Sequence, residues 1–399
     1  MIEDKNDIVI LLGAGFSKPA GLPLAKEINS YFLRDNAQTL LNFSSGEWKW
    51  TDFANGPDLN NGKFGSNFFT YGFILNQWVN SFIEHNGDFS NYEGFYQFII
   101  DNYKTKFILT PIYSKALLAF SKCYPTIKKN PNYKNFTSAL NEPQNSEIVN
   151  LINHLISDLL HPRKYLSEVI STYSPFIELM QACEKVHIIT LNHDLLLEGI
   201  LQEKEIDYSD GFSFINSPLR HRDKNIKFFD NEFSQDISVV KLHGSIDTYI
   251  FVILKHYGLH SQPTEDYFYF KTLDYYEKQR PELVNPDTGE VLQDSHSNIT
   301  PQFITGTRKD EIIATDTMYA SLYSEFDNRI HSSQNLLIIG YSFMDEHVNK
   351  KIISAINSGV TRKVVNVNPN QPFPYTNDHI EIVNLRSISV LSNSVFNHE

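Results

Sequence analysis

Several short apolar runs in this sequence end in polar residues whose side chains could bind a ligand or take part in catalysis. In chain order these residues are Asn192, Asp194, His243, Gly340, Ser342, Asn366 and Asn368. An imidazole titrates near neutral pH and can act as a general base, so His243 is the candidate proton acceptor. Carboxamides and carboxylates hold water or hydroxyl groups by hydrogen bonds. If four of these strand ends meet at one edge of a β-sheet, their polar residues would form a binding or catalytic site.

A glycine turn near the N-terminus adds a candidate for phosphate binding. The apolar run 8–12 leads into Gly13-Ala14-Gly15, and Ser17 follows. Paired glycines after a strand let the backbone approach a phosphate, and the N-terminus of the next helix favours the anion. The dehydrogenase fingerprint would need a third glycine where Lys18 stands, and a Gly-Lys-Ser/Thr phosphate loop is absent. A tight turn without a ligand stays open as the alternative.

A parallel sheet is the architecture that would bring these residues together. The pattern predicts buried strands around residues 8–12, 186–192, 237–245, 302–307, 335–343 and 363–369. Helices are predicted at residues 22–33, 195–204, 317–331 and 345–357. Short buried strands that alternate with helices indicate an α/β, Rossmann-like fold with helices on both faces of the sheet. In such sheets ligands bind at the carboxyl ends of the strands.

The alternation stops between residues 35 and 185, where the sequence predicts a mostly helical insertion. We expect its helices around residues 73–82, 94–103, 148–160 and 175–183. Residues 1–34 and 186–399 would then form one discontinuous domain. The insertion is rich in aromatic residues that look exposed, which suggests oligomer or partner contacts. The polar segment 256–297 reads as a second insertion.

Composition excludes several classes of function. The net charge of -13 argues against direct binding of nucleic acid, which needs concentrated Lys and Arg. The chain has two cysteines, Cys123 and Cys183, and no CxxC pair, so we expect neither a thiolate zinc site nor a disulfide framework. Asp345-Glu346-His347 reads as a helix start rather than a metal site. Without a signal peptide or a bilayer-length apolar run, we expect a cytoplasmic protein with no membrane contact.

Taken together, these motifs resemble the sirtuin (silent information regulator) family. The family's Gly-Ala-Gly-Ile-Ser and Gly-Ile-Pro are similar to residues 13–17 and 21–23, and its Thr-Gln-Asn-Ile-Asp is similar to residues 190–194. Its catalytic His-Gly pair matches His243-Gly244. Its Gly-Thr-Ser segment and its ribose-binding Asn resemble Gly340-Tyr341-Ser342 and Asn368. The resemblance covers residues 4–33 and 186–386, in the family's order.

The resemblance implies NAD as the substrate. Two departures from the family's motifs indicate which branch of the family the chain resembles. Sirtuin deacylases carry a zinc ribbon of four cysteines after the catalytic His, which this chain lacks. Leu24-Ala25 also replaces the family's Phe-Arg. What remains is similar to the sirtuin-like NAD hydrolases of bacterial antiphage defence, which deplete NAD in infected cells. That branch implies no zinc, a large homo-oligomer and pairing with a separately encoded HerA-like ATPase.

The resemblance also implies a role for each catalytic candidate. Asn192 would position the attacking water and the nicotinamide ribose, and His243 would be the general base. Asp194 would accept a hydrogen bond from the nicotinamide carboxamide, and it could also cap the helix that starts at Leu195. Asn192 could instead close a turn, and His243 could be a satisfied buried histidine. His193 is expected to be structural.

The remaining candidates would bind the rest of the dinucleotide. Gly13, Ala14, Gly15 and Ser17 would face the pyrophosphate, and Ser17 could instead cap the following helix. Gly340, Ser342 and Asn368 would bind the adenosine phosphate and ribose. Two other functions stay open. One is NAD-dependent protein deacylation or ADP-ribosyl transfer, and the other is a non-catalytic module that senses NAD or ADP-ribose.

Overall fold

The computed structural model describes residues 7–33, 38–42, 48–52, 68–102, 115, 118, 145–161, 166–257, 260–272, 281–293 and 300–396. Contacts divide the chain into two compact units. The first unit comprises Met1–Leu22, Leu160–Ile304 and Asp310–Glu399, and the second comprises Pro23–Leu159 and Thr305–Lys309. All the candidate site residues belong to the first unit.

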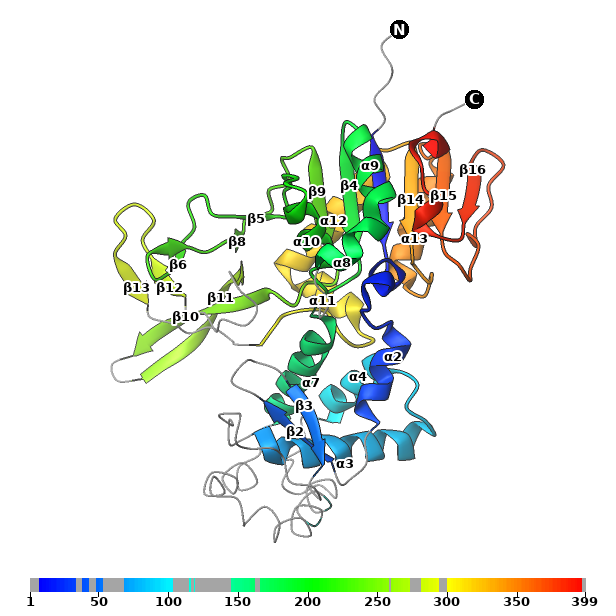
Figure 1. The fold of residues 1–399 in the computed structure, drawn as a ribbon. Coiled ribbons are helices and arrows are strands. Elements are labelled where there is room, and N and C mark those ends of the chain that lie inside the picture. The colour runs from blue at the N-terminus through cyan, green and yellow to red at the C-terminus, as the bar shows by residue number, and fades with distance from the viewer. Residues whose placement is uncertain are drawn as a thin grey trace. The chain divides into compact units, whose positions relative to one another are not determined.

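A six-stranded parallel sheet forms the centre of the first unit (Figure 1). Its strand order is β16-β15-β14-β1-β4-β9. The strands are β1 (Ile8–Leu12), β4 (Val186–Thr190), β9 (Ile237–Lys241), β14 (Asn335–Ile339), β15 (Lys363–Val367) and β16 (Glu381–Leu385). Five of them were expected from buried apolar runs. The edge strand β16 was missed because it is partly exposed and carries no such run.

Helices cover both faces of this sheet, which confirms the predicted α/β class. Successive side chains of a strand point to opposite faces. Ile8, Ile10 and Leu12 therefore belong to one buried cluster, together with residues of α9 (Ser174–Ala182) and α10 (Leu196–Glu203). Val9 and Leu11 belong to the opposite cluster, with residues of α12 (Thr317–Ile330) and α13 (Glu346–Asn357). Burial on both faces explains why these strands read as continuous apolar runs.

The direction in which strands are added reverses at β1. From β1 the chain adds β4 and then β9 on one side, and later adds β14, β15 and β16 on the other. This is the doubly wound order, whose switch point lies between β1 and β14. Ligands of open α/β sheets bind outside the carboxyl ends of the strands at such a point. The topology therefore marks the end of β1 before any side chain is considered.

The segment after β1 differs from the prediction. Helix α1 (Ala14–Ser17) starts inside the glycine turn, and a 3-10 turn, η1 (Lys18–Ala20), continues it. The longer helix, expected at residues 22–33, is α2 (Ala25–Phe32), which belongs to the second unit. Leu24 is its N-cap residue, so Pro23 precedes the helix rather than occupying its first turn. A short helix suffices here because the glycines already turn the chain.

An antiparallel β module occupies much of residues 212–293, where a polar insertion was expected from residue 256. Two four-stranded sheets contain β5 (Phe212–Ser213), β6 (Leu219–His221), β7 (Lys224–Asn225), β8 (Phe228–Phe229), β10 (Thr248–Tyr257), β11 (His260–Lys271), β12 (Glu282–Val284) and β13 (Val291–Gln293). Most of these strands are too short to show a period. The strand expected at 302–307 is absent, because Phe303 forms only an isolated bridge with Gly244.

Shorter elements complete the first unit. They are α8 (Leu166–Val169), η5 (Ile170–Tyr173), α11 (Lys309–Thr315), η6 (Ile388–Val390) and η7 (Asn393–Phe396). Among the described residues of the whole chain, no helix is both long enough and apolar enough to cross a bilayer.

The second unit is mainly helical. It contains α2, β2 (Gln38–Asn42), β3 (Trp48–Asp52), α3 (Phe68–Asn86), α4 (Tyr92–Asn102) and α7 (Asn145–Leu160). Three of the helices expected in the insertion are therefore confirmed, and the fourth is α9 of the first unit. The aromatic residues Phe32, Phe82, Phe89 and Phe95 pack against one another and are buried. The expectation that aromatic residues of the insertion 35–185 are exposed is wrong for Phe82, Phe89 and Phe95. Most of residues 103–144 lies outside the described part of the chain.

Candidate functional site

The strand ends of the sheet meet at one edge in a common register. Leu12 pairs with Thr190 and with Ile339, Thr190 pairs with Lys241, and Ile339 pairs with Val367. These five residues end their strands at the same level. Gly13, Asn192, His243, Gly340 and Asn368 follow within two residues of them. The structure therefore brings together at one edge the residues that the sequence predicted to converge.

Three glycines let the segments that follow β1 and β14 touch backbone to backbone. The Gly13 amide donates to the Ile339 carbonyl at 2.9 Å, and the Gly15 amide donates to the Gly340 carbonyl at 2.9 Å. A Cβ on Gly15 would lie 2.6 Å from the Gly340 Cα atom, and Gly340 has a φ of +65°. The glycines are thus required for packing at the switch point, and two of their amides are used there. Their contact with a phosphate stays a prediction.

A hydrogen-bonded group links the glycine turn to the end of β4. The Ser17 hydroxyl donates to Asp194 Oδ2 at 2.8 Å and accepts from Asn192 Nδ2 at 3.1 Å. Asn192 Nδ2 also donates to the Gly13 carbonyl at 3.0 Å. Ser17 makes no capping hydrogen bond, so the capping alternative is wrong. Its function in the structure is to connect Asn192 with Asp194.

Hydrogen bonds made by one of its two polar atoms, Nδ2, orient the Asn192 carboxamide. Both hydrogen bonds of the side chain involve Nδ2, and no described residue donates a hydrogen bond to Oδ1. The side chain is half-buried. Asn192 therefore presents a fixed acceptor, Oδ1, that can receive a hydrogen bond from a water molecule or a hydroxyl group.

Asp194 is a buried carboxylate with both oxygens occupied. Oδ2 accepts from Ser17, and Oδ1 accepts from the Leu196 amide at 3.0 Å, at the start of α10. The N-cap residue of α10 is Leu195 rather than Asp194 as predicted, so Asp194 contacts the first helical amide from one residue further back. Its contact with a carboxamide stays a prediction. Burial raises the pKa of Asp194, although the nearby Lys241 ammonium and these hydrogen bonds oppose the shift.

His243 is buried and faces a second carboxylate. Its Nε2 atom lies 3.3 Å from Asp345 Oδ2, and the two side chains are only 7% and 8% exposed. The Ile304 amide donates to the His243 carbonyl at 2.8 Å. The His193 ring centroid lies 6.1 Å from that of His243 and 4.7 Å from that of Phe303. His193 is thus packed between aromatic rings.

Asp345 lies beside His243, although the sequence analysis did not assign it to the site. It caps α13, as predicted, because Oδ1 accepts from the amides of His347 and Val348 at 3.0 and 3.2 Å. Its other oxygen faces His243. The helix-start pattern was visible in the sequence, but nothing in the spacing links residue 345 to residue 243. We call Ser17, Asn192, Asp194, His243 and Asp345 the strand-end cluster.

The ends of β14 and β15 are joined by Asn368. Its Nδ2 atom donates to the Tyr341 carbonyl at 3.0 Å, and its Oδ1 accepts from the amides of Asn370 and Gln371. Ser342 is exposed. Asn366 is fully buried inside β15 and bonds Asn384, so it does not end a strand as the pattern suggested. Binding of an adenosine group by Gly340, Ser342 and Asn368 stays a prediction.

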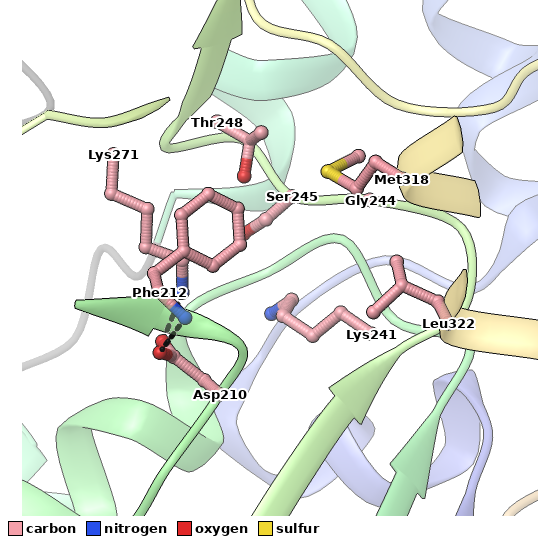
Figure 2. Close-up of a pocket in the computed structure, with 9 residues that line it drawn as sticks. All are labelled: Asp210, Phe212, Lys241, Gly244, Ser245, Thr248, Lys271, Met318 and Leu322. Carbon is pink, nitrogen blue, oxygen red and sulfur yellow. Dashed lines mark hydrogen bonds and ion pairs between the residues drawn. The ribbon is translucent and has the colours of Figure 1, made fainter. Parts of the chain in front are cut away.

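A small cavity opens beside the residues that follow His243 (Figure 2). It is lined by Asp210, Phe212, Lys241, Gly244, Ser245, Thr248, Lys271, Met318 and Leu322. Lys271 Nζ lies 2.6 Å from Asp210 Oδ2 and 3.8 Å from Asp247 Oδ2, and Lys241 Nζ lies 2.8 Å from Glu198 Oε1. We call Glu198, Asp210, Lys241, Asp247 and Lys271 the charge cluster.

Each charge of the Lys271–Asp210 pair stabilises the other. Burial would lower the pKa of Lys271, but the carboxylates of Asp210 and Asp247 outweigh it and hold this pKa well above its usual value. Burial would likewise raise the pKa of Asp210, but Lys271 holds it below its usual value. Both groups are therefore charged at neutral pH. In the part of the chain that the structure describes, no three His, Cys, Asp or Glu side chains are grouped to hold a metal ion.

Comparison with known proteins identifies the central part of the chain. Residues 186–370 match a family model described as SIR2-like domain. That span contains Asn192, His243, Gly340 and Asn368. The predicted resemblance is therefore confirmed to this extent: residues 186–370 are similar to a SIR2-like domain. No curated protein matches the chain.

Solved structures of Sir2 proteins align along most of the chain. A triple mutant of a Sir2 homologue in complex with 2′-O-acetyl-ADP-ribose is 12% identical, with a TM-score of 0.39, and the alignment covers 98% of this chain and 91% of that one. A Sir2 homologue in complex with NAD is 10% identical, with a TM-score of 0.31, and the alignment covers 98% of this chain and 88% of that one.

Proposed function

We propose that this protein is an NAD glycohydrolase that splits NAD and water into ADP-ribose and nicotinamide. The observation that carries the proposal is the position of Asn192 and His243, each two residues beyond the paired ends of the adjacent strands β4 and β9, within the SIR2-like span. One of them offers a fixed acceptor and the other a buried imidazole with a carboxylate beside it. A module that only senses NAD would need no general base.

The residues at the edge fit a dinucleotide with a scissile glycosidic bond. NAD supplies that bond, between nicotinamide and C1′ of the ribose, and a positive charge develops on the sugar as it breaks. Asn192 Oδ1 would hold the attacking water by accepting one of its hydrogen bonds. His243 would take the proton that this water releases when its oxygen bonds to C1′. The Ser17–Asn192–Asp194 hydrogen bonds keep the carboxamide in place beforehand, which reduces the entropic cost of positioning the water.

Hydrolysis is favoured over deacylation by the cysteine content. The peptide groove of sirtuin deacylases is framed by a four-cysteine zinc ribbon, and this chain has two cysteines. Water, unlike a peptide, needs no binding groove to act as the acceptor of the ADP-ribosyl group. We further propose that the enzyme acts in the cytoplasm in bacterial antiphage defence, as an oligomer that a HerA-like ATPase regulates. An unregulated NAD hydrolase would harm its own cell, so control by a partner is a natural requirement.

Product analysis tests this function directly. The purified protein, alone and co-expressed with its ATPase, is incubated with NAD in the presence and absence of an acetylated peptide, and nicotinamide and ADP-ribose are quantified. We expect release without peptide, and a loss of about 10²–10⁴-fold in His243→Ala. Asn192→Ala should lose activity as well, whereas the exposed residues His379 and Asn370 can be changed to Ala without effect.

The alternatives give different results in the same assay. Strict dependence on peptide would establish deacylation or transfer instead of hydrolysis. Calorimetric binding of NAD without turnover, with the ATPase present, would establish a sensor. Either result contradicts the proposed hydrolase.

A further inference from the structure

The two oxygens of the Asp345 carboxylate contact different groups. Its Oδ1 atom accepts the amides of His347 and Val348 at the start of α13. Its Oδ2 atom lies 3.3 Å from His243 Nε2, with both side chains more than nine-tenths buried. A capping interaction needs only one acceptor oxygen. The second oxygen is therefore available to the imidazole without weakening the cap.

The turn before α13 fixes Asp345 in this position. The Tyr341 hydroxyl lies 3.2 Å from the Asp345 amide, 3.1 Å from its carbonyl and 2.9 Å from Asn349 Oδ1. Asn349 Nδ2 donates to the Phe343 carbonyl at 2.8 Å. Phe343 is buried although its φ is +55°, a conformation that a bulky residue adopts only when its surroundings impose it. The carboxylate is thus oriented by the fold itself.

We propose that Asp345 is a positioning residue for His243, orienting its imidazole and stabilising the imidazolium that forms when His243 accepts a proton. This inference rests on the proposed function. With Nε2 turned toward Asp345, Nδ1 is the nitrogen that takes the proton from water or from a ribose hydroxyl. A carboxylate that holds an imidazole in one tautomer makes the opposite nitrogen the base.

Titratable side chains from other elements lie beside the His243 ring. Asp345 comes from the start of α13, and His193 comes from the segment after β4, 6.1 Å away between ring centroids. Tyr323 of α12 interacts electrostatically with Asp345, and burial together with that charge raises its pKa, so it is neutral at working pH. Among the described residues, Asp345 is therefore a carboxylate in direct contact range of the imidazole.

Asp316 provides a matched control for the capping role. It caps α12 in the same way, with Oδ1 accepting from the amides of Met318 and Tyr319 at 3.0 and 3.2 Å. Its Oδ2 atom accepts from the hydroxyls of Tyr267 and Tyr269, at 2.9 and 2.5 Å, rather than facing a histidine. Asn is as good an N-cap residue as Asp. Asp345→Asn and Asp316→Asn therefore keep their caps and differ in whether a charge beside His243 is lost.

Steady-state kinetics of the whole protein give the first readout. We expect Asp345→Asn to lower kcat for NAD cleavage about tenfold or more, a part of the roughly 10²–10⁴-fold that a general base contributes. KM should change little, because Asp345 is not expected to touch the substrate. Asp316→Asn should keep wild-type kcat, and both variants should melt close to the wild type. An unchanged kcat in Asp345→Asn would overturn the positioning role.

A second readout does not depend on NAD cleavage. In protein labelled with ¹³C at histidine Cε1, the His243 resonance is identified by its loss in His243→Gln. Its pH midpoint should move to lower pH in Asp345→Asn and stay in place in Asp316→Asn, because the carboxylate favours the protonated ring. If wild-type protein fails to cleave NAD, the proposed function fails while this titration still decides the contact. An unmoved midpoint would then overturn the proposal.

Discussion

The strand-end cluster and the charge cluster lie in the same unit and differ in how their charges are compensated. In the charge cluster, Lys271 pairs with Asp210 and Asp247, and Lys241 pairs with Glu198. The pKa shifts of Lys271 and Asp210 both favour the charged forms. In the strand-end cluster, burial raises the pKa of Asp194 and so disfavours its charge. Asn192 also keeps one acceptor without a donor among the described residues.

This difference separates a structural role from a functional one. Mutually stabilised charges in a small cavity serve the fold, and removing one partner leaves the other buried and uncompensated. A buried carboxyl group with a raised pKa, beside an acceptor that no described residue occupies, is typical of a ligand site. We therefore expect mutations in the charge cluster to act on stability and mutations in the strand-end cluster to act mainly on activity.

The largest effect on stability is expected from a mutation that removes one charge of the charge cluster. Lys271→Met leaves the Asp210 carboxylate buried without its partner, so the free energy of unfolding should fall by about 3–5 kcal/mol. Urea denaturation measures this loss. Lys363 is a control, because it is equally buried but its partner Glu381 is 54% exposed, and Lys363→Met should cost about 1 kcal/mol or less. NAD cleavage per folded Lys271→Met molecule should change little. A selective loss of kcat in this variant would contradict the division of roles.

A smaller effect is expected on the pH dependence of the free energy of unfolding. His187 lies on β4, where burial, Arg329 and Lys185 lower its pKa to about 4. The folded state thus resists a proton that the unfolded state binds below about pH 6.5. Stability should be complete above that pH and should decline as the pH falls toward 4, by about 3 kcal/mol in all at about 1.4 kcal/mol per pH unit. Denaturation at several pH values checks this. His187→Gln should flatten the decline, and His379→Gln should not.

The smallest effect on stability should accompany a clear effect on activity. Ser17→Ala removes the hydroxyl that joins Asn192 to Asp194, at an expected cost of about 1–2 kcal/mol of unfolding free energy. Ser333 is buried in a similar way, with its hydroxyl bonded to the backbone carbonyls of Asp7, before β1, and Asn335, at the start of β14. Ser333→Ala should cost about as much. NAD cleavage should fall in Ser17→Ala and persist in Ser333→Ala. Equal activity in the two variants would count against the strand-end cluster.

Much of the sheet could be predicted from the sequence because its strands are buried on both faces. Ile8–Leu12 and Leu336–Ile339 are unbroken apolar runs, which are typical of strands buried on both faces of a parallel sheet. The register then follows from parallel pairing, so Asn192 and His243 were expected at the same edge. The glycines at 13, 15 and 340 were also recognised, although their main observed contacts are with one another.

What the sequence could not predict depends on contacts between distant segments. Asp345 shows a helix start locally, but its approach to His243 exists only because α13 and the end of β9 meet in the fold. Lys241 and Lys271 lie on strands, and only the folded chain reveals the carboxylates that neutralise them. The short strands of the β module also carry too few residues for a period. The sequence therefore does not reveal which side chains from distant segments contact one another.

The most direct test of the account is the rate of nicotinamide release from NAD by the wild type and by Asn192→Ala, with folded protein verified for both. The account predicts release without any peptide acceptor and a loss of that release in the variant. Equal release by the two proteins would contradict it, because the carboxamide at the end of β4 would then have no part in breaking the glycosidic bond.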